Sequence, residues 1–334
     1  MAEKNTLLEV KHLRTSFFTN NGEVKAVNDV SFHVDRGEVV AIVGESGCGK
    51  SVTQMSIMQL VQSPPGRILG GEVLLDGTNI LQYKSNSKEM RAIRGSKIAM
   101  IFQEPMTALN PVMTIGKQLT EVIRTHRDVS KKEALEIAEK ALDAVGIPDA
   151  KARLSNYPFE MSGGMRQRAM IATAVACEAE LLIADEPTTA LDVTTQAQVM
   201  ELLVDIVHKR NMSLIIVTHN LGVVNRYADR IYVMYAGHVI EQGTTEQLIK
   251  TPKHPYTVGL LASVPKLEND EGEQLVPIPG TPPNLTDIPD ICPFIPRCSF
   301  ACDKCKNSPM PPLEKTKDAK HYLACYVNID EAER

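Results

Sequence analysis

The chain has 334 residues, of which 43% are hydrophobic, and its formal net charge is -5. This length is enough for one large domain with an appendage, and the hydrophobic content excludes disorder over most of the chain. A net negative charge lacks the basic footprint with which proteins neutralise nucleic-acid phosphates, so no nucleic acid is expected as a partner. The sequence has neither an apolar run of about 18 residues nor a signal peptide's apolar core, which predicts a cytoplasmic protein that reaches a membrane only through partners.

The predicted fold class is α/β. Short β-like segments at 7–10 and 30–34 are separated by the turn-rich Thr19-Asn20-Asn21-Gly22, and they predict an antiparallel layer. Four apolar runs, too short for buried helices, follow at 39–43, 98–102, 181–184 and 214–217. They predict the central strands of a mostly parallel sheet that is covered on both faces.

A long helical region separates the second and third of these runs. Its clearest helix is predicted to begin at Ser130, where Glu133 completes a capping box, and to end at Gly146 just before Pro148. The apolar stripe of this helix is expected to serve packing alone and consists of Leu135, Ile137, Ala138, Ala141, Leu142 and Val145. After Gly243, an acidic run at 269–273 and four prolines between 277 and 283 predict a linker into a small C-terminal module.

Residues 44–51 match the phosphate-binding pattern GxxxxGK[ST], directly after the buried strand 39–43 and before a helical stretch. The glycines let successive backbone N–H groups turn inward around a phosphate, and the following helix adds its positive end. Lys50 is expected to reach the outer phosphates and Ser51 to offer its hydroxyl to Mg²⁺. Cys48 is interpreted as a small residue whose backbone matters, not as a redox group. The expected nucleotide-binding residues here are Gly44, Glu45, Ser46, Gly47, Cys48, Gly49, Lys50, Ser51 and Val52.

Polar side chains follow the other three predicted central strands, at the edge where sheets of this class bind ligands. Asp185 is expected to support the metal, and Glu186 to polarise an attacking water as general base. Gln103 is expected to ligate Mg²⁺ or to sense the γ-phosphate, and His219 places an imidazole at the same edge.

At this point the sequence resembles the nucleotide-binding subunits of ATP-binding cassette (ABC) transporters. Residues 162–168, Ser-Gly-Gly-Met-Arg-Gln-Arg, are a close form of the LSGGQ signature, although Met165 replaces Gln and Met161 replaces Leu. The family's Q-loop matches Gln103, its D-loop matches Ala190-Leu191-Asp192, and its switch histidine matches His219. The resemblance implies that an aromatic side chain stacks on adenine, with Phe17 chosen and Phe18 an equal candidate.

The resemblance also implies an architecture. An ABC ATPase domain is expected over 1–250 with a helical subdomain at about 104–178, then a Pro-rich linker over 251–285 and a metal-binding module over 286–334. In the family, two such domains sandwich two ATP molecules. Ser162, Gly163 and Gly164 of one chain would then bind the γ-phosphate held by the phosphate loop of the other, because they open a helix.

Further motifs resemble those of the oligopeptide and dipeptide import ATPases, with nickel importers as close relatives. They are Gln103-Glu104-Pro105-Met106, Leu109-Asn110-Pro111, Tyr157-Pro158, His254-Pro255-Tyr256-Thr257 and the tail from Cys292. This branch implies an ATP-driven motor at the cytoplasmic face of the membrane, peripherally bound. Its implied partners are a second ABC ATPase subunit (a copy or a paralogue), two integral membrane permease subunits and, indirectly, an extracellular substrate-binding protein.

Four cysteines of the tail have the spacing of this branch: Cys292, Cys298, Cys305 and Cys325. Four thiolates can hold a tetrahedral Zn²⁺ or an iron–sulfur cluster, and the residues also allow unmetallated or disulfide-bonded cysteines. The separations of five, six and nineteen residues are wider than two CxxC knuckles, which favours a [4Fe–4S] cluster over zinc. Cys302 is interpreted as a bystander, although it forms a CxxC with Cys305 and could compete as a ligand.

Three other functions remain open from the sequence. A nickel-importer ATPase belongs to the same branch, and the cargo is chosen by proteins other than this one. A soluble ABC ATPase of translation or DNA repair usually has two cassettes or a long coiled-coil insertion, and this chain has neither. A redox-regulated ATPase would use the cysteine module as its sensor.

Overall fold

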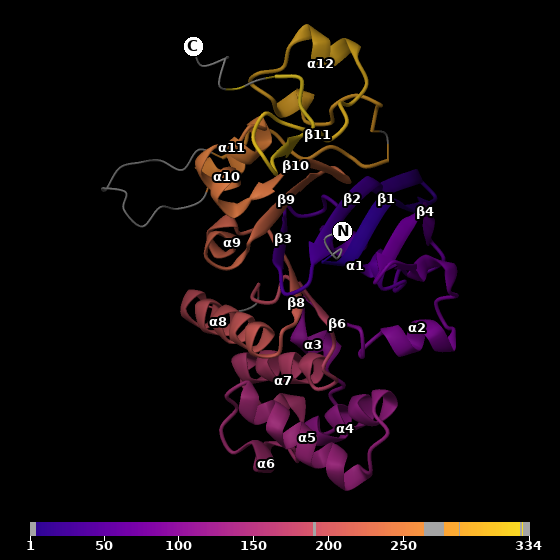
Figure 1. Cartoon of the computed structure of the whole chain (residues 1–334), viewed down its shortest axis with the longest axis vertical. Coiled ribbons are helices and arrows are strands. Elements are labelled where there is room, and N and C mark those ends of the chain that lie inside the picture. The colour runs from indigo at the N-terminus through magenta and orange to yellow at the C-terminus, as the bar shows by residue number, and fades with distance from the viewer. Residues whose placement is uncertain (1–4, 190–191, 264–276, 287, 328, 330–334) are drawn as a thin grey trace. The chain divides into compact units, whose positions relative to one another are not determined.

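The computed structural model describes residues 5–189, 192–263, 277–286, 288–327 and 329. The chain divides into two compact units. Figure 1 labels the helices and strands that make up the units. The first unit comprises residues 1–5, 35–38 and 82–217, and the second comprises residues 6–34, 39–81 and 218–334. Each unit has its own sheet strands and helices.

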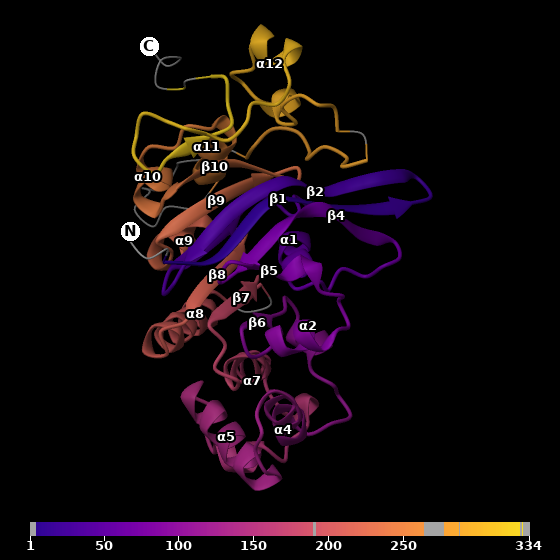
Figure 2. The same cartoon turned by 45° about the vertical axis from the view of Figure 1, so that its right-hand side comes forward.

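An antiparallel sheet forms the N-terminal layer of the second unit. Its strands have the order β2-β1-β4-β5, and Figure 2 shows β1, β2 and β4 as one ribbon layer. The bounds are Thr6–Thr19 for β1, Gly22–Asp35 for β2, Gly66–Leu75 for β4 and Thr78–Asn79 for β5. The predicted segments 7–10 and 30–34 lie inside β1 and β2, and the predicted antiparallel layer is confirmed. Both strands are longer than predicted. Outside the predicted segments they carry more exposed polar residues, which weakens the apolar pattern.

A second set of strands in the same unit has the order β11-β12-β10-β9-β3. The bounds are Val39–Val43 for β3, Arg230–Tyr235 for β9, His238–Thr244 for β10, Glu314–Lys315 for β11 and Tyr322–Leu323 for β12. β3 pairs with β9 in parallel, whereas the other pairs are antiparallel. Ala236 and Gly237 join β9 to β10, both with positive φ, as a tight two-residue hairpin requires. The C-terminal strands β11 and β12 therefore extend a sheet that contains β3.

The second unit has five helices among its described residues. They are α1 (Lys50–Ile57), α9 (Leu221–Tyr227), α10 (Thr245–Lys250), α11 (Pro255–Ala262) and α12 (Asp303–Asn307). The segment expected as a linker thus contains α11, whose Tyr256 and Leu260 are buried in one hydrophobic core with Tyr235 and Phe294. Residues 269–273, the acidic run of that segment, lie outside the described residues.

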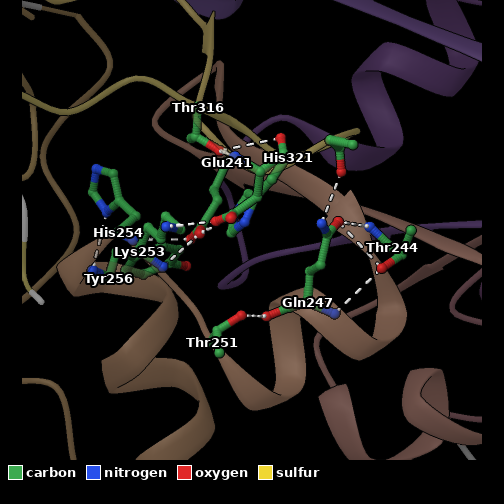
Figure 3. Close-up of polar contacts among 11 residues, drawn as sticks. Glu241, Thr244, Gln247, Thr251, Lys253, His254, Tyr256, Thr316 and His321 are labelled. Atoms are coloured by element: carbon green, nitrogen blue, oxygen red, sulfur yellow. Dashed lines mark hydrogen bonds and ion pairs between the residues drawn. The ribbon is translucent and has the colours of Figure 1, made fainter.

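A buried carboxylate joins three parts of the second unit (Figure 3). Glu241 in β10 accepts hydrogen bonds from the backbone N–H groups of Lys253 (2.6 Å) and His254 (3.0 Å), and its Oε1 lies 2.8 Å from Nε2 of His321. Both Glu241 and His321 have no exposed side-chain surface. The ammonium of Lys253 also pairs with Asp318 at 2.7 Å. The segment before β12 is therefore fastened to β10 and to the start of α11.

Three neighbouring parallel strands form the sheet of the first unit: β6 (Ile98–Ile101), β7 (Leu181–Asp185) and β8 (Ser213–Thr218). Together with β3, they confirm the four predicted central strands. Side chains of β7 and β8 are buried throughout, as expected for strands covered on both faces. Phe102 lies just beyond the end of β6 and is 41% exposed.

Helices make up most of the rest of the first unit. They are α2 (Lys88–Ile93), α3 (Pro105–Ala108), α4 (Ile115–His126), α5 (Lys131–Ala144), α6 (Ala150–Arg153), α7 (Gly163–Val175) and α8 (Val193–Lys209). The capping box of Ser130 and Glu133 starts α5 as predicted. The predicted stripe is wrong at Leu135, which is 44% exposed, whereas Ala134 is buried. Ala134 has the correct spacing because it precedes the buried Ala138 by one helical turn.

Among the described residues, no helix combines the length and the apolar composition needed to cross a bilayer.

Candidate active site

The phosphate loop lies in the second unit, between β3 and α1, and two of its glycines are required by close contacts. Gly44 has φ +157°, and a Cβ there would lie 2.2 Å from the carbonyl oxygen of Met234. Gly49 has φ +104°, and a Cβ there would lie 2.1 Å from the carbonyl oxygen of Ala26. Any larger residue would push the loop away from these strands. Gly47 also has a positive φ, but open space surrounds it.

Lys50 and Ser51 form the first turn of α1, where unpaired N–H groups favour an anion. The side chain of Lys50 is buried, and its ammonium donates to the carbonyl oxygens of Gly44 (2.7 Å) and Glu45 (2.9 Å). Burial raises the pKa of the Cys48 thiol, against the lowering effect of Lys50. A thiol with a raised pKa is a poor nucleophile, which agrees with a packing role for Cys48.

Two residues that fasten the loop were missed in the sequence. The Tyr256 hydroxyl accepts a hydrogen bond of 2.8 Å from the backbone N–H of Glu45, and the Arg297 guanidinium pairs with the Glu45 carboxylate at 2.6 Å. Tyr256 and Arg297 lie 211 and 252 positions from Glu45, so no local pattern links them to it.

The two aromatic candidates for adenine stacking are neighbours in β1. Phe17 is half-buried, and a Cβ added at Gly66 would lie 2.9 Å from its ring. Phe18 is 43% exposed, and the guanidinium of Arg67 lies 5.3 Å from its ring centroid. Because neighbours in a strand point to opposite faces, the two rings cannot serve the same ligand. The assignment to Phe17 stays a prediction.

Gln103 and Glu186 come together in the first unit. The amide Nε2 of Gln103 donates to Oε2 of Glu186 at 3.2 Å, and the Thr189 hydroxyl donates to the same oxygen at 2.8 Å. The backbone of Glu186 has φ 45°, and its N–H donates to the carbonyl oxygen of Val217 at 2.9 Å. Asp185, one residue earlier, is 5% exposed at the end of β7. The structure thus gives the candidate base a fixed position with two side-chain donors.

The signature residues open α7 as predicted. Ser162 is the N-cap, and its hydroxyl accepts from the N–H of Met165 at 3.3 Å. Gly163 is surrounded by open space, and a Cβ on Gly164 would lie 3.6 Å from Thr195 of α8. The buried Gln167 donates from its amide to the carbonyl oxygen of Pro187 at 2.6 Å. The signature helix is therefore bonded to the turn that carries Glu186, a role of Gln167 that the sequence did not reveal.

The remaining predicted site residues are placed as follows. His219 is exposed directly after β8 and lies in the second unit, as does the phosphate loop. Asp192 caps α8 by accepting from the N–H of Thr195 at 3.0 Å. Ala190 and Leu191 of the predicted D-loop lie outside the described residues. Gln103, Asp185, Glu186 and the signature all lie in the first unit.

The four predicted cysteine ligands lie in the second unit and influence one another. The pKa of Cys325 is raised to about 12, chiefly by burial, and charges on Cys292, Cys298 and Cys305 would raise it further. Burial likewise raises the pKa of Cys292 and of Cys298. Four thiolates are chemically suited to bind a metal. Their positions do not form a metal site here, because no three His, Cys, Asp or Glu among the described residues are close enough to hold a metal ion.

The two cysteines in direct contact are Cys302 and Cys305, whose sulfurs lie 3.5 Å apart. The sequence suggests that Cys302 is a bystander, and this contact places it beside one of the four predicted ligands. Hydrogen bonds from the backbone and from Cys305 lower the pKa of the exposed Cys302, whereas burial raises that of Cys305.

Comparisons with known proteins show which proteins this chain resembles. The family model described as ABC transporter matches residues 27–189, and the model described as oligopeptide/dipeptide transporter, C-terminal region, matches residues 240–305. The oligopeptide transport ATP-binding protein OppD of Bacillus subtilis (strain 168) is 50% identical over 327 residues, which cover 98% of this chain and 90% of that protein. The dipeptide transport ATP-binding protein DppD of the same organism is 48% identical over 98% of this chain and 96% of its own length.

A solved structure is similar as well. It is a dimeric post-hydrolysis state of the ATP-binding cassette MJ0796 bound to ADP and Pi, with a TM-score of 0.64 and 26% identity. The match covers 71% of this chain and 98% of that cassette, so part of this chain extends beyond the cassette. The chain has a phosphate loop in close contact with its neighbouring strands, and it pairs Gln103 with Glu186. Together with these matches, this leads to one conclusion: the chain belongs to the ABC transporter ATPases, in the branch that carries the oligopeptide/dipeptide transporter C-terminal region.

Proposed function

We propose that this chain is the ATP-hydrolysing subunit of an importer for dipeptides or oligopeptides. The observation that carries the proposal is the 48% to 50% identity, over 98% of this chain, to proteins named for oligopeptide or dipeptide transport. The similarity extends beyond the cassette into the oligopeptide/dipeptide transporter C-terminal region.

In the proposed mechanism, the second unit binds the nucleotide. Phosphate oxygens would accept hydrogen bonds from the inward N–H groups of the loop and from those in the first turn of α1. The Lys50 ammonium, which donates to two carbonyl oxygens of the loop, would instead donate to the outer phosphates. Ser51, Gln103 and Asp185 would hold Mg²⁺, directly or through water. When bound, the cation would supply charge neutralisation for the phosphates.

Glu186 acts as the general base. It would accept a proton from the attacking water, while the amide of Gln103 and the hydroxyl of Thr189 orient its carboxylate. Because Gln103 directs its nitrogen to Glu186, its amide oxygen is the atom available to Mg²⁺. His219 would contact the γ-phosphate as the switch histidine.

A second ABC ATPase subunit, a copy or a paralogue, completes each site. Ser162 and the N–H groups of Gly163 and Gly164 open α7, and they would bind the γ-phosphate on the partner subunit. ATP then joins the two subunits, and hydrolysis separates them. This cycle would move the membrane subunits.

The test of the mechanism is Glu186→Gln, which keeps the shape of the side chain and removes its basicity. We expect this variant to bind ATP as the wild type does, to form a stable ATP-bound dimer and to lose nearly all hydrolysis. The matched control is Glu178→Gln, because Glu178 also has a positive φ (59°) and lies on an exposed surface. Full turnover by Glu186→Gln would remove Glu186 as the base.

The proposed membrane partners are two integral permease subunits, which this chain would contact at the cytoplasmic face of the membrane. An extracellular substrate-binding protein would act through them. A candidate contact surface is the exposed stacked pair of Tyr157 and Phe159, whose ring centroids lie 5.5 Å apart and of which Phe159 is 69% exposed. We expect the chain to co-purify with permeases from solubilised membranes, and Phe159→Ser to weaken that association. Association with ribosomes instead of permeases would contradict the proposal.

The cysteine module would hold a [4Fe–4S] cluster, with Zn²⁺ as the alternative. The residues concerned are Cys292, Cys298, Cys305 and Cys325, which influence one another's pKa values. Bound metal would fold the module by crosslinking it. The test is anaerobic purification: brown protein with iron supports the cluster, whereas colourless protein with one zinc overturns it. Cys325→Ser should lower the metal content and Cys302→Ser should not.

A further inference from the structure

Glu45, the second residue of the phosphate loop, is bonded to the cysteine module. The two terminal nitrogens of Arg297 donate to the two oxygens of the Glu45 carboxylate, at 2.6 Å and 2.9 Å. This is a bidentate pair, the geometry in which a guanidinium binds a carboxylate most strongly. Arg297 ends a short 3-10 turn (Ile295–Arg297) and directly precedes Cys298.

Arg297 is also held in place by contacts with residues other than Glu45. Its Nε donates to the carbonyl oxygen of Pro279 at 2.8 Å, and a terminal nitrogen lies 3.4 Å from the Tyr235 hydroxyl. The rings of Tyr235 and Phe294 each lie 5.9 Å from the guanidinium carbon. The side chain of Arg297 is 4% exposed and that of Glu45 is 27% exposed, so solvent reaches this pair mainly from the side of Glu45. The hydrogen bonds that Arg297 donates to Glu45 also raise the pKa of Arg297, which stays charged.

The backbone of Glu45 is fixed as well as its side chain. Its N–H donates to Tyr256 of α11, and its carbonyl oxygen accepts from Lys50, the residue that is expected to reach the outer phosphates. A shift of Glu45 would therefore move the loop backbone and the contacts of Lys50 together. Gly44 lies close against the carbonyl oxygen of Met234, so the loop has no room to move in that direction.

We propose that Arg297 is a positioning residue of the nucleotide site: its pairing with Glu45 holds the phosphate loop in the shape that accepts ATP. The C-terminal module is then a part of the ATP site, and its attachment to the loop sets the affinity for ATP. The proposal rests on ATP binding by this family and is independent of the cargo.

The experiment measures ATP affinity of the full-length chain with Mg²⁺, by displacement of a fluorescent ATP analogue, alongside the melting temperature. The variants are Arg297→Gln, Arg297→Lys and Glu45→Gln. The matched control is Asp318→Asn, which breaks another ion pair of the C-terminal region, that of Lys253 with Asp318. This second pair fastens the segment before β12 to the start of α11, so it reports attachment of the C-terminal region alone.

We expect Arg297→Gln and Glu45→Gln to weaken ATP binding at least about tenfold, because each leaves a charged partner, the half-buried Glu45 or the buried Arg297, without its bidentate contact. Arg297→Lys keeps the charge without the fork, so it should recover part of the affinity. Asp318→Asn should change ATP affinity less than about twofold, as expected for a half-exposed ion pair.

Equal ATP affinities of folded Arg297→Gln and the wild type would overturn the proposal, and so would equal losses in Arg297→Gln and Asp318→Asn. If Arg297→Gln does not fold, Arg297→Lys decides: wild-type ATP affinity in this variant contradicts a positioning role, because the bidentate contact is gone.

Discussion

Glu186 is the residue at which backbone conformation and proposed chemistry meet. Its φ of 45° lies in the left-handed region, which costs a non-glycine residue about 1–3 kcal/mol. The hydrogen bond from its N–H to Val217 and those from Gln103 and Thr189 to its carboxylate offset this cost. Strain that surrounding contacts maintain is typical of functional sites, and here it holds the carboxylate of the proposed base in one place.

Gly49 gives the first prediction for a single residue. In Gly49→Ala, the new Cβ would meet the carbonyl oxygen of Ala26 at 2.1 Å with φ at +104°, so the loop must move. We expect at least a tenfold loss of ATP affinity, equal to about 1.4 kcal/mol. Titration with an ATP analogue measures it.

The control for this prediction is Gly70→Ala. A Cβ at Gly70 meets nothing within 4 Å, and its φ is not in the left-handed range. Wild-type ATP affinity in Gly49→Ala would contradict this prediction, because it would mean that the close contact with Ala26 does not disturb the loop.

At the scale of elements, α11 depends on a histidine. His254 is its N-cap and accepts from the N–H of Tyr256 through Nδ1 at 3.0 Å, which requires that nitrogen to carry no proton. Burial lowers the pKa of His254 from 6.5 to about 4. Protonation would remove the cap of the helix whose Tyr256 holds the phosphate loop.

The pH dependence follows from this depressed pKa. Between pH 6.5 and about 4 the unfolded chain binds a proton at His254 that the folded chain does not. The contribution of His254 to the free energy of unfolding is therefore fully present above pH 6.5. It is lost as the pH falls, and the loss reaches about 3 kcal/mol once the pH is below both pKa values. Urea unfolding at a series of pH values measures the slope.

His254→Asn keeps a cap that does not titrate, and it should flatten the slope over this range. The slope should not vanish, because burial also lowers the pKa of His238 to about 4. Identical slopes in wild type and His254→Asn would contradict the assignment.

A second prediction concerns the attachment of β12 to β10. Glu241 is fully buried and accepts from His321 and from two backbone N–H groups, so Glu241→Ala leaves these three donors without their acceptor (Figure 3). We expect the free energy of unfolding to fall by about 3–5 kcal/mol. The control Glu246→Ala removes an exposed pair with Lys250 and should cost less than about 1 kcal/mol. Equal effects in the two variants would mean that this network does not fasten the C-terminal strand.

The elements that the sequence predicts are those with local causes. The four central strands follow from uninterrupted apolar runs, and α5 begins where a capping box lies within four residues. α11 is not predicted because its surroundings are rich in proline, although Pro255 at the first helical position is itself a start signal. The pairing of β10 with β12 joins residues about 80 positions apart, and neither strand pattern indicates its partner.

At the scale of the whole molecule, the predicted site residues belong to different units. The phosphate loop and His219 lie in the second, whereas Gln103, the signature, Asp185 and Glu186 lie in the first. Sequence motifs predict all of these as site residues because each has a fixed local spacing. The sequence does not predict the roles of Tyr256, Gln167 and Arg297. These roles depend on contacts with residues 211, 20 and 252 positions away, respectively. The C-terminal module is thereby more than an appendage, since it shares a core and a sheet with β9 and contacts the phosphate loop.

The central claim is that this chain drives peptide import by hydrolysing ATP, and uptake of labelled peptides by cells tests it most directly. Cells that lack this chain would receive the wild type or Glu186→Gln, with nickel uptake measured in parallel. We predict that the wild type restores uptake of labelled dipeptides or oligopeptides, that Glu186→Gln does not, and that nickel uptake is unaffected. Peptide uptake that is equal with and without this chain, or a loss of nickel uptake alone, would contradict it.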